Sequence, residues 1–462
     1  MRRRLPSINK NQPIQNMKRI LCMACLALAM TTQAKKWTPD EVMDVISRVN
    51  TYWQTNNPAE VRAFWDNAAY HTGNMEVCKL FLIRNEKLGI RNYDYSAASS
   101  SADSAYRSNH HSSFLIPHSS LNQWLDYSIR WAEHNKWQGA TETDKSKWKY
   151  KNYGEGQDYV LFGDWQICFQ TYIDLYNLEG RSKRGEVRKY SATSASAETS
   201  ADSAFRSNHH SSFLIPHSSF KIARAKEVLG YEADSRVRDY WWWADALYMV
   251  MPALTKMYKL TGDTKYLRKL YENICYSDSI MLDYQTGLYF RDGRYVYPKH
   301  KTEAGKKDFW ARGDGWVLAG LAKVLQDMPE TYVRKPWFVE KFTRMAYAVA
   351  KCQQPKGHWT RSMLDPKQAP GYETSGTAFF CYGLLWGVNN GYLPKKYFAP
   401  VVEKAWNYLT TIALQKDGKV GYVQPIGDRA IPGQVINADS QANFGVGAFL
   451  LAACEYYRYV GQ

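Results

Sequence analysis

Segments with apolar residues at helical spacing follow one another along most of this 462-residue chain. Apolar side chains at i, i+3 and i+4 share one face of an α-helix, and that face needs a partner to cover it. Strand-like alternation is scarce, and residues 287–297 are the best candidate for a hairpin or extended loop. The pattern predicts an all-α fold of helical hairpins joined by short turns, as a superhelical repeat or a closed toroid. The predicted helices cover residues 124–132, 164–180, 244–258, 264–277, 316–325, 379–387, 401–414 and 445–457.

A nearly perfect repeat interrupts this pattern, because residues 101–120 and 200–219 differ only at Tyr106 and Phe205. Both copies follow Ser/Ala-rich tracts, a composition typical of loops or disorder. We interpret them as low-complexity inserts at about residues 96–120 and 190–220. They contain most of the histidines, but a Ser-rich loop lacks the rigid spacing of a metal site, so we expect none. These histidines are His110, His111, His118, His209, His210 and His217.

The first 34 residues are typical of an export signal. A basic stretch at Lys18 and Arg19 precedes an apolar run over residues 20–30, and Ala34 ends a small-x-small cleavage site. The apolar run is too short for a stable membrane anchor. We therefore expect translation to start at Met17, cleavage after Ala34, and export to the periplasm. Residues 35–462 are expected to form a single domain.

The net charge of +16 initially suggests a nucleic-acid partner. Six Lys or Arg residues and no acid lie within residues 1–34, the remaining charge is dispersed, and no nucleic-acid-binding motif is present. A basic surface suits an acidic glycan equally well. The chain also has 17 Trp and 34 Tyr, which favours either flat-faced ligands or an aromatic-rich core.

The cysteines outside the signal are single residues, mostly within helical apolar patterns. No Cys-x-x-Cys pair remains, so a zinc site of that type is not expected. A free thiol packs like a small apolar group, and buried free thiols are therefore the favoured interpretation. Disulfides are permitted in an exported protein but cannot be assigned from the sequence. These residues are Cys78, Cys168, Cys275, Cys352, Cys381 and Cys454.

A Trp-rich run at residues 240–249 contains the first candidate for chemistry. Asp245 lies between Trp243 and Tyr248, where loss of water favours the neutral carboxylic acid. That is the state required of a general acid near neutral pH. Asp is also common as a helix N-cap, and spacing alone favours the cap.

Two further segments place polar residues among aromatic ones before a helix. In residues 309–316, Trp310 and Trp316 could flank a sugar ring, and Arg312 could bind a carboxylate through two parallel hydrogen bonds. Its alternative is a capped loop–helix junction in which Arg312 pairs with a structural acid. In residues 371–378, the side chains of Glu373, Ser375 and Thr377 could bind sugar hydroxyls or cap the following helix.

Asp164 begins another apolar helical face, where it is either a cap or a group that points into a central cavity. Together these segments resemble glycoside hydrolase family 105 and its relative family 88. The matching pieces are DWQICFQTYIDLY, DYWWWADALYMVMPAL with KMYKLTGD, GLYFRDGRYVYP, FWARGDGW and ETSGTAFF, spread over residues 37–457. Their ordered combination is highly specific.

The resemblance implies an (α/α)6 toroid of six helical hairpins and an unsaturated uronyl hydrolase. It implies that Asp245 is the general acid/base, Asp164 the second active-site carboxylate, and Arg312 and Trp316 uronyl-binding residues. Relatives that prefer rhamnogalacturonan often carry His where this chain has Arg291 or Asp292, which leaves the exact substrate open. The full expected substrate-binding set is Trp243, Arg291, Trp310, Arg312, Trp316, Glu373, Ser375 and Thr377.

The reaction implied is hydration of the C4=C5 double bond of a terminal unsaturated uronic acid, without metal or organic cofactor. Candidate substrates are acidic oligosaccharides made by lyases from pectin, rhamnogalacturonan or arabinogalactan. Two alternatives stay open. One is an inverting glycosidase that uses Asp164 and Asp245 on saturated sugars, and the other is a non-catalytic helical protein that binds acidic glycans. The oligomeric state is not determined by the sequence.

Overall fold

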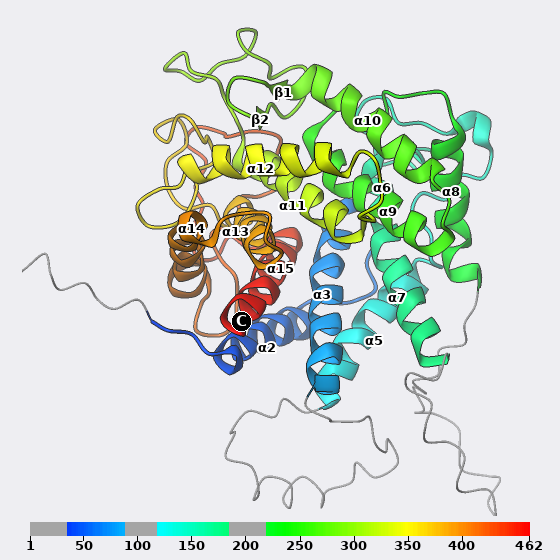
Figure 1. The fold of residues 1–462 in the computed structure, drawn as a ribbon, viewed down its shortest axis with the longest axis horizontal. Helices are drawn as coiled ribbons and strands as arrows, with labels where there is room; N and C mark the ends of the chain where they lie inside the picture. The colour runs from blue at the N-terminus through cyan, green and yellow to red at the C-terminus, as the bar shows by residue number, and fades with distance from the viewer. Residues whose placement is uncertain (1–34, 88–117, 184–218) are drawn as a thin grey trace, which may run out of the picture. The chain divides into compact units, whose positions relative to one another are not determined.

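A computed structural model describes residues 35–87, 118–183 and 219–462. The predicted signal and most of both Ser/His-rich repeats lie outside these residues. The chain divides into two units, Met1–Thr38 and Pro39–Gln462. The helices that form the fold belong to the second unit and are described below (Figure 1).

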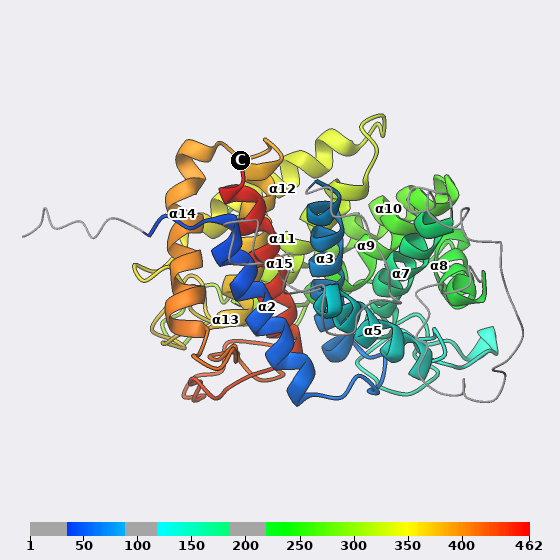
Figure 2. The ribbon, with the colours of Figure 1, turned by 90° about the horizontal axis from the view of Figure 1, so that it is seen from below.

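The helices of Pro39–Gln462 alternate along the chain between an outer and an inner ring. The inner helices pack on one another in sequence order, and α15 packs on α3 to close the ring, as the views in Figures 1 and 2 also show. Each outer helix packs on an inner neighbour. This is the (α/α)6 toroid of six helical hairpins. The inner helices are α3 (Trp65–Lys87), α7 (Cys168–Lys183), α9 (Ala244–Thr261), α11 (Ala311–Asp327), α13 (Thr374–Asn389) and α15 (Asn443–Val460).

The outer helices are amphipathic, whereas several inner helices are apolar on nearly every side because both rings cover them. In α13, every residue from Thr374 to Val388 is buried. The outer helices are α2 (Pro39–Asn56), α5 (His118–His134), α8 (Ala223–Asp234), α10 (Lys265–Met281), α12 (Lys335–Lys351) and α14 (Lys395–Tyr408). Short elements complete the described chain: α6 (Gly163–Gln166), η1 (Lys145–Lys147), η2 (Ser219–Ile222) and η3 (Leu409–Ala413).

Strand structure among the described residues is confined to one small antiparallel pair. β1 (Leu282–Asp283) pairs with β2 (Leu288–Tyr289), with Leu282 opposite Tyr289. This confirms a hairpin at the start of the predicted 287–297 segment. The chain after β2 continues to the inner ring, where Asp292 bridges to Trp243.

The predicted helices are all present, and several of their boundaries are corrected. α7 continues through Gly180 to Lys183, because a glycine weakens a helix by only about 1 kcal/mol and does not have to end it. α11 begins at Ala311, so Arg312 and Trp316 lie in its first turns and not in a preceding loop. By contrast, Gly262 ends α9 as expected, with a left-handed φ of 74°. α5 begins at His118, so the last residues of the first repeat are helical.

The cysteine prediction is confirmed for the described chain, where all six thiols outside the signal are free. Five are buried, and Cys275 is half-buried. They lie within apolar surroundings, where burial raises the pKa of, for example, Cys78 to about 12. These thiols therefore act as small apolar side chains.

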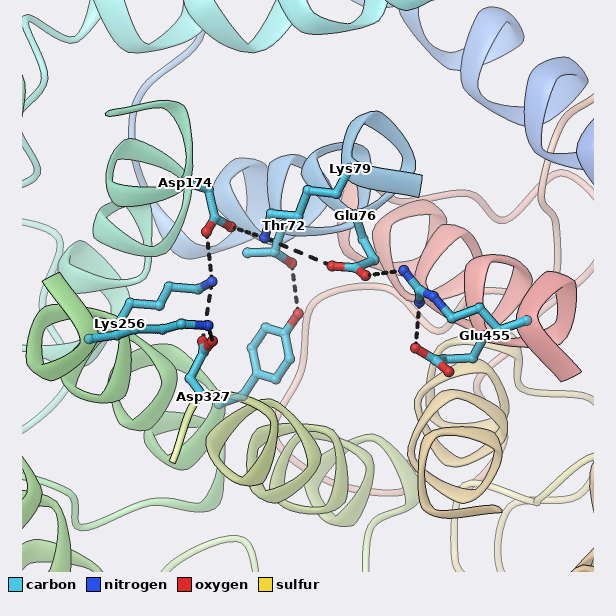
Figure 3. A network of polar contacts seen from close by, with 10 residues as sticks. Thr72, Glu76, Lys79, Asp174, Lys256, Asp327 and Glu455 are labelled. Carbon is cyan, nitrogen blue, oxygen red and sulfur yellow. Dashed lines mark hydrogen bonds and ion pairs between the residues drawn. The ribbon is translucent and has the colours of Figure 1, made fainter. Parts of the chain in front are cut away.

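The C-terminal halves of the inner helices meet in a buried network of charges (Figure 3). Lys256 contacts Asp174 at 2.7 Å and Asp327 at 3.5 Å, and Lys79 contacts Asp174 at 2.7 Å. Burial acts to raise the pKa of Asp174, but Lys256 and Lys79 hold it well below its usual range. Cations near helix C-termini are also favoured by the helix dipoles. Asp174 is therefore ionised and paired with lysines from two neighbouring inner helices.

The ring closes where two glycines let α3 and α15 touch. A Cβ on Gly447 would lie 2.4 Å from the carbonyl oxygen of Ala69, and one on Gly73 would lie 2.3 Å from that of Gly447. Side chains cannot occupy these positions without moving the backbone. Close helix contact at this seam therefore depends on glycine.

We expect Gly447→Ala to lower the free energy of unfolding by about 1–3 kcal/mol, because overpacking shifts the two helices apart. Gly230→Ala is the matched control, since Gly230 also lies within a helix and a Cβ there meets only the Tyr266 hydroxyl at 3.8 Å. The control should gain about 0.5–1 kcal/mol. Chemical denaturation measures both, and equal effects of the two substitutions would contradict close packing at the seam.

Candidate active site

The N-terminal ends of the inner helices gather several carboxylates at the opposite end from the charge network. Asp66 lies in the first turn of α3, Asp164 in that of α6 just before α7, and Asp245 in that of α9. Contacts between helix starts confirm the arrangement: Trp65 packs on Phe444 at 5.2 Å, and the Arg312 guanidinium lies 4.7 Å from the Phe444 ring. The positive ends of the helix dipoles therefore converge where an anionic substrate could bind.

Asp245 is not a helix cap. The N-cap of α9 is Trp243, which forms no side-chain cap bond, and Oδ2 of Asp245 is buried without a hydrogen-bond partner. Asp164 likewise follows an N-cap, Phe162, that forms no side-chain cap bond. The two carboxylates are only 8% and 4% exposed. Their position is therefore not explained by capping, and they remain available for chemistry.

Aromatic rings hold the two acid-bearing helix starts together. Phe162 stacks on Trp243 with ring centroids 4.5 Å apart, and Trp242 lies 4.6 Å from Trp243. Trp243 is 1% exposed. Trp243, predicted to bind substrate, is thus a buried residue that packs below the site surface. Its neighbour Trp242 is only half-buried.

Burial controls the charge state of both acids. It raises the pKa of Asp164 well above the usual range, the nearby Asp245 raises it further, and Arg291 lowers it. Burial also raises the pKa of Asp245, against the lowering effects of Arg291 and Arg312. Two carboxyls within electrostatic range do not both ionise easily. Burial therefore favours the protonated form of both acids, and general acid catalysis requires that form of the proton donor.

Arg291 is the cation placed directly at Asp245. Its Nε lies 3.4 Å from Oδ2 of Asp245, and its Nη1 donates to Asp292 at 2.8 Å. Asp292 is fixed in turn by Arg294 through bonds of 2.8 to 3.0 Å. The loop after β2 therefore carries the guanidinium into the site.

Arg312 is engaged with backbone carbonyls. It is 1% exposed, and its two terminal nitrogens donate to the carbonyl oxygens of Gln424 at 2.7 Å and Pro425 at 2.9 Å. The guanidinium also lies 4.6 Å from the Trp310 ring. Burial lowers its pKa to about 10. In this structure Arg312 holds the 422–442 loop against the site, and among the described residues no acid forms an ion pair with it, contrary to the capped-junction alternative.

The two tryptophans of residues 309–316 do not lie as a pair around an open sugar site. Trp316 is completely buried and packs on Phe379 at 4.3 Å and Tyr248 at 4.8 Å. Trp310 is 3% exposed, and its Nε1 donates to Gln424 at 2.9 Å. The early start of α11 turns Trp316 inward, so it forms an aromatic layer below the carboxylates and cannot stack on a ligand here.

The segment around Glu373 is a helix cap. Glu373 is the N-cap of α13 and accepts bonds from the backbone N–H groups of Ser375 at 2.9 Å and Gly376 at 2.7 Å. The Thr377 hydroxyl donates to the Glu373 carbonyl at 2.6 Å. All three predicted side chains, Glu373, Ser375 and Thr377, are 0% exposed. Of the two sequence interpretations, the structural one therefore fits them.

Asp66 and Asp314 belong to this end of the ring but were not singled out as site residues. Oδ1 of Asp66 is buried without a hydrogen-bond partner, and its charge acts on Asp164. Asp314 is completely buried and accepts the N–H of Tyr289 at 2.8 Å. In the sequence, Asp66 directly follows a Trp at a helix start, much as Asp245 follows Trp243 by two positions, whereas Asp314 lies four positions after Trp310 and does not fit this pattern.

Within the described residues, no group of three or more His, Cys, Asp or Glu side chains could hold a metal ion. Most of the histidines in the two repeats lie outside those residues. Across the same described part of the chain, no helix is long and apolar enough to cross a membrane.

Among known protein families, the model of Glycosyl Hydrolase Family 88 matches residues 117–460, about three quarters of the chain. The chain belongs to this family. Two curated relatives are the unsaturated 3S-rhamnoglycuronyl hydrolases of Formosa agariphila, 39% identical over 219 residues, and of Alteromonas sp., 37% identical over 225 residues. These alignments span 46% and 49% of this chain and only 57% and 53% of the relatives.

Solved structures of other proteins are similar to this chain over nearly its whole length. A polysaccharide lyase is 52% identical, with a TM-score of 0.72, over 92% of this chain and 98% of its own. A family 88 glycosyl hydrolase from Bacteroides vulgatus is 46% identical, with a TM-score of 0.73, over 92% and 100%. A possible family 105 member from Salmonella enterica, 17% identical with a TM-score of 0.57, shares the fold.

We expect Asp314→Asn to stabilise the protein relative to the native chain as pH rises. Burial raises the pKa of Asp314 well above its usual range, so the folded state binds this proton more tightly than the unfolded state. Native stability is therefore lost as pH rises from about 4 towards the folded pKa, and the amide is free of this penalty. Urea unfolding from about pH 4 to 7 measures the difference, and a constant difference across that range would contradict the prediction.

Proposed function

We propose that this protein removes a terminal 4,5-unsaturated uronic acid from oligosaccharides released by polysaccharide lyases. The observation that carries the proposal is the buried acid Asp245, whose pKa is raised, held 3.4 Å from the Arg291 guanidinium among converging helix N-termini. A buried acid with a raised pKa beside a cation suits a substrate that needs both protonation and carboxylate binding. Family membership and the names of the curated relatives support the same chemistry.

In the proposed reaction, Asp245 donates its proton to C4 of the enol ether, and the ring oxygen shares the positive charge that develops at C5. Water then adds at C5 while Asp164 or Asp245 accepts its proton. The resulting hemiketal opens, the bond to the neighbouring sugar breaks, and a 5-keto uronate remains. The double bond itself is the reactive group, so the residues described need only bind, protonate and orient water.

Arg291 connects binding to protonation in this scheme. A uronate carboxylate that binds Arg291 competes with Asp245 for the same guanidinium. The pKa of Asp245 is lowered by Arg291 in the free protein, so substrate binding should raise it and favour the acid form. Binding of the correct substrate would thus favour the protonated form of Asp245, the proton donor.

The adjoining sugar in the proposed substrate is rhamnose, by analogy with the rhamnoglycuronyl relatives. Pectic rhamnogalacturonan and arabinogalactan are the polymers we propose as sources. The basic and apolar residues before Ala34 support export to the periplasm, where lyase products would be encountered.

A second candidate reaction is β-elimination, favoured by the 52% identity to a polysaccharide lyase over almost all of both chains. In that reaction Arg291 would neutralise the carboxylate of a saturated uronate while a base removes the C5 proton. The C4–O bond then breaks, C4=C5 forms, and the leaving oxygen takes a proton from an acid. The same anion site serves both reactions, which run in opposite directions with respect to the double bond.

The ultraviolet absorbance of the conjugated uronate separates these reactions. Incubation with lyase-generated unsaturated rhamnose-linked disaccharides should abolish the absorbance and release rhamnose. Rising absorbance on saturated rhamnose-capped uronates, with none lost from the unsaturated ones, would replace hydration by elimination. Cleavage of saturated sugars without an absorbance change would indicate an inverting glycosidase, and binding without conversion a glycan-binding protein.

We expect Asp245→Asn to lower kcat by at least about 10²-fold, because one positioned acid contributes roughly 10²–10⁴ to the rate. The folded state should be retained, since the amide has nearly the shape of the carboxylic acid. Single-turnover absorbance decay measures the rate, and circular dichroism checks the fold. Near-native turnover by a folded variant would eliminate Asp245 as the proton donor.

We expect Arg291→Gln to lower kcat/KM for the free uronate roughly 10- to 100-fold, since a hydrogen bond to a charged group is worth about 1.5–3 kcal/mol. The methyl ester of the same substrate offers no carboxylate and should lose far less. Equal losses for acid and ester would show that Arg291 does not bind the carboxylate.

A further inference from the structure

An exposed tyrosine lies at the edge of the aromatic group that supports the two acids. Tyr153 is 52% exposed, and its ring meets Phe162 edge-on with centroids 5.8 Å apart. Phe162 is the N-cap of α6, two residues before Asp164, and the charge of Asp164 acts on the Tyr153 hydroxyl. A large ring therefore stays open to solvent beside a buried carboxylate.

The aromatic group continues from this tyrosine across both acid-bearing helix starts. Phe162 is stacked on Trp243 at 4.5 Å and on Trp242 at 6.3 Å, with interplanar angles of 24° in both cases. The middle members Phe162 and Trp243 are buried, whereas Tyr153 and Trp242 remain reachable. We call these four residues, Tyr153, Phe162, Trp242 and Trp243, the aromatic shelf.

The reachable ends of the shelf are fixed by hydrogen bonds. The Tyr153 hydroxyl donates to Glu155 at 2.8 Å, and Arg62 donates to the other carboxylate oxygen of Glu155. Trp242 Nε1 donates to the carbonyl of Tyr150 at 3.0 Å. The rings are therefore held in place before any ligand arrives, which lowers the entropy that binding must overcome.

Charge at the Tyr153 end disfavours an anionic ligand. The cation beside it, Arg62, is already paired with Glu155 and lowers the pKa of that carboxyl, so an ionised carboxylate lies at the Tyr153 hydroxyl. The cation that faces Asp245, Arg291, lies on the loop after β2. A sugar on the shelf would therefore meet rings and acids, while the uronate carboxylate is drawn to Arg291.

We propose that Tyr153 and Trp242 form the binding platform for the neutral sugar attached to the unsaturated uronate. This inference rests on the proposed function, since it places the reacting uronate at Asp245 and the departing sugar one position outward. The apolar face of a 6-deoxyhexose, with its methyl group, matches exposed aromatic rings, which bind through area and have few polar demands. Tyr153 is thus a specificity-determining residue for the leaving sugar and acts separately from the acids.

The test compares two substrates that share the unsaturated uronate and differ in what leaves: a 6-deoxyhexose or a methyl group. Tyr153→Ala should raise KM for the disaccharide about 3- to 10-fold, the range expected for an aromatic contact, and leave the methyl glycoside unchanged. Tyr153→Phe keeps the ring and should stay near the native value with both. Tyr397→Ala, which removes a 45% exposed tyrosine from the first turn of outer helix α14, is the matched control and should change neither.

Equal loss on both substrates would overturn the platform in favour of a structural role, and so would an unchanged KM for the disaccharide. A sulfated deoxyhexose in place of the neutral one should bind more weakly, and tighter binding of the sulfated sugar would overturn the assignment of a neutral ligand.

Calorimetric titration with the saturated uronate–deoxyhexose disaccharide separates this inference from the proposed reaction. A Kd raised about 3- to 10-fold by Tyr153→Ala supports the platform even if the native protein converts none of the unsaturated substrates. An unchanged Kd overturns the platform even if the native protein is an active hydrolase.

Discussion

The common direction of the six inner helices is the constraint on which the rest of the structure depends. Because outer and inner helices alternate along the chain, every inner helix starts at the same end of the ring. One end therefore collects helix N-termini with their partial positive charge, and the other collects C-termini. Acids such as Asp164 and Asp245 lie at the first end, and the lysine-containing network lies at the second (Figure 3).

Buried acids at the two ends have opposite charge behaviour. In the network, Asp174 contacts two lysines and its pKa is held low, whereas at the site burial dominates and the pKa values of Asp164 and Asp245 are raised. The difference is the number of close cations and not the degree of burial. Groups with raised pKa values that lack full partners are typical of functional sites, and the paired network is typical of structural stabilisation.

The two arginines at the site have different roles: Arg312 stabilises the fold, and Arg291 is placed to bind an anion. Arg312 is committed to the carbonyls of Gln424 and Pro425, so it fixes the 422–442 loop. Arg291 reaches Asp245 from the loop after β2, and Asp292 and Arg294 brace it. Arg291 is a permanent cation and not a titratable group, which suits recognition of a carboxylate.

The helical pattern, the buried thiols and the acids at helix starts could be read from the sequence, because they follow from local spacing and burial tendency. The Trp-rich run identified Asp245, and family motifs identified Asp164. Spacing alone could not decide whether Asp245 and Glu373 were caps, or whether Trp310 and Trp316 faced a ligand. Those choices depend on where a helix begins: α11 begins at Ala311 and buries Trp316, and α13 begins beside Glu373, which becomes its cap.

The sequence by itself therefore determined the class of fold and indicated which aspartates are the candidate catalytic acids. Only the tertiary structure decided which charges meet. Four charged residues that are far apart in the chain come close together because ring closure between α3 and α15 brings their helix starts and the loop after β2 to one end of the ring. They are Asp66, Asp164, Asp245 and Arg291. The pKa of a carboxyl depends on its neighbours in space and on its exposure to water, and neither is present in a local sequence pattern.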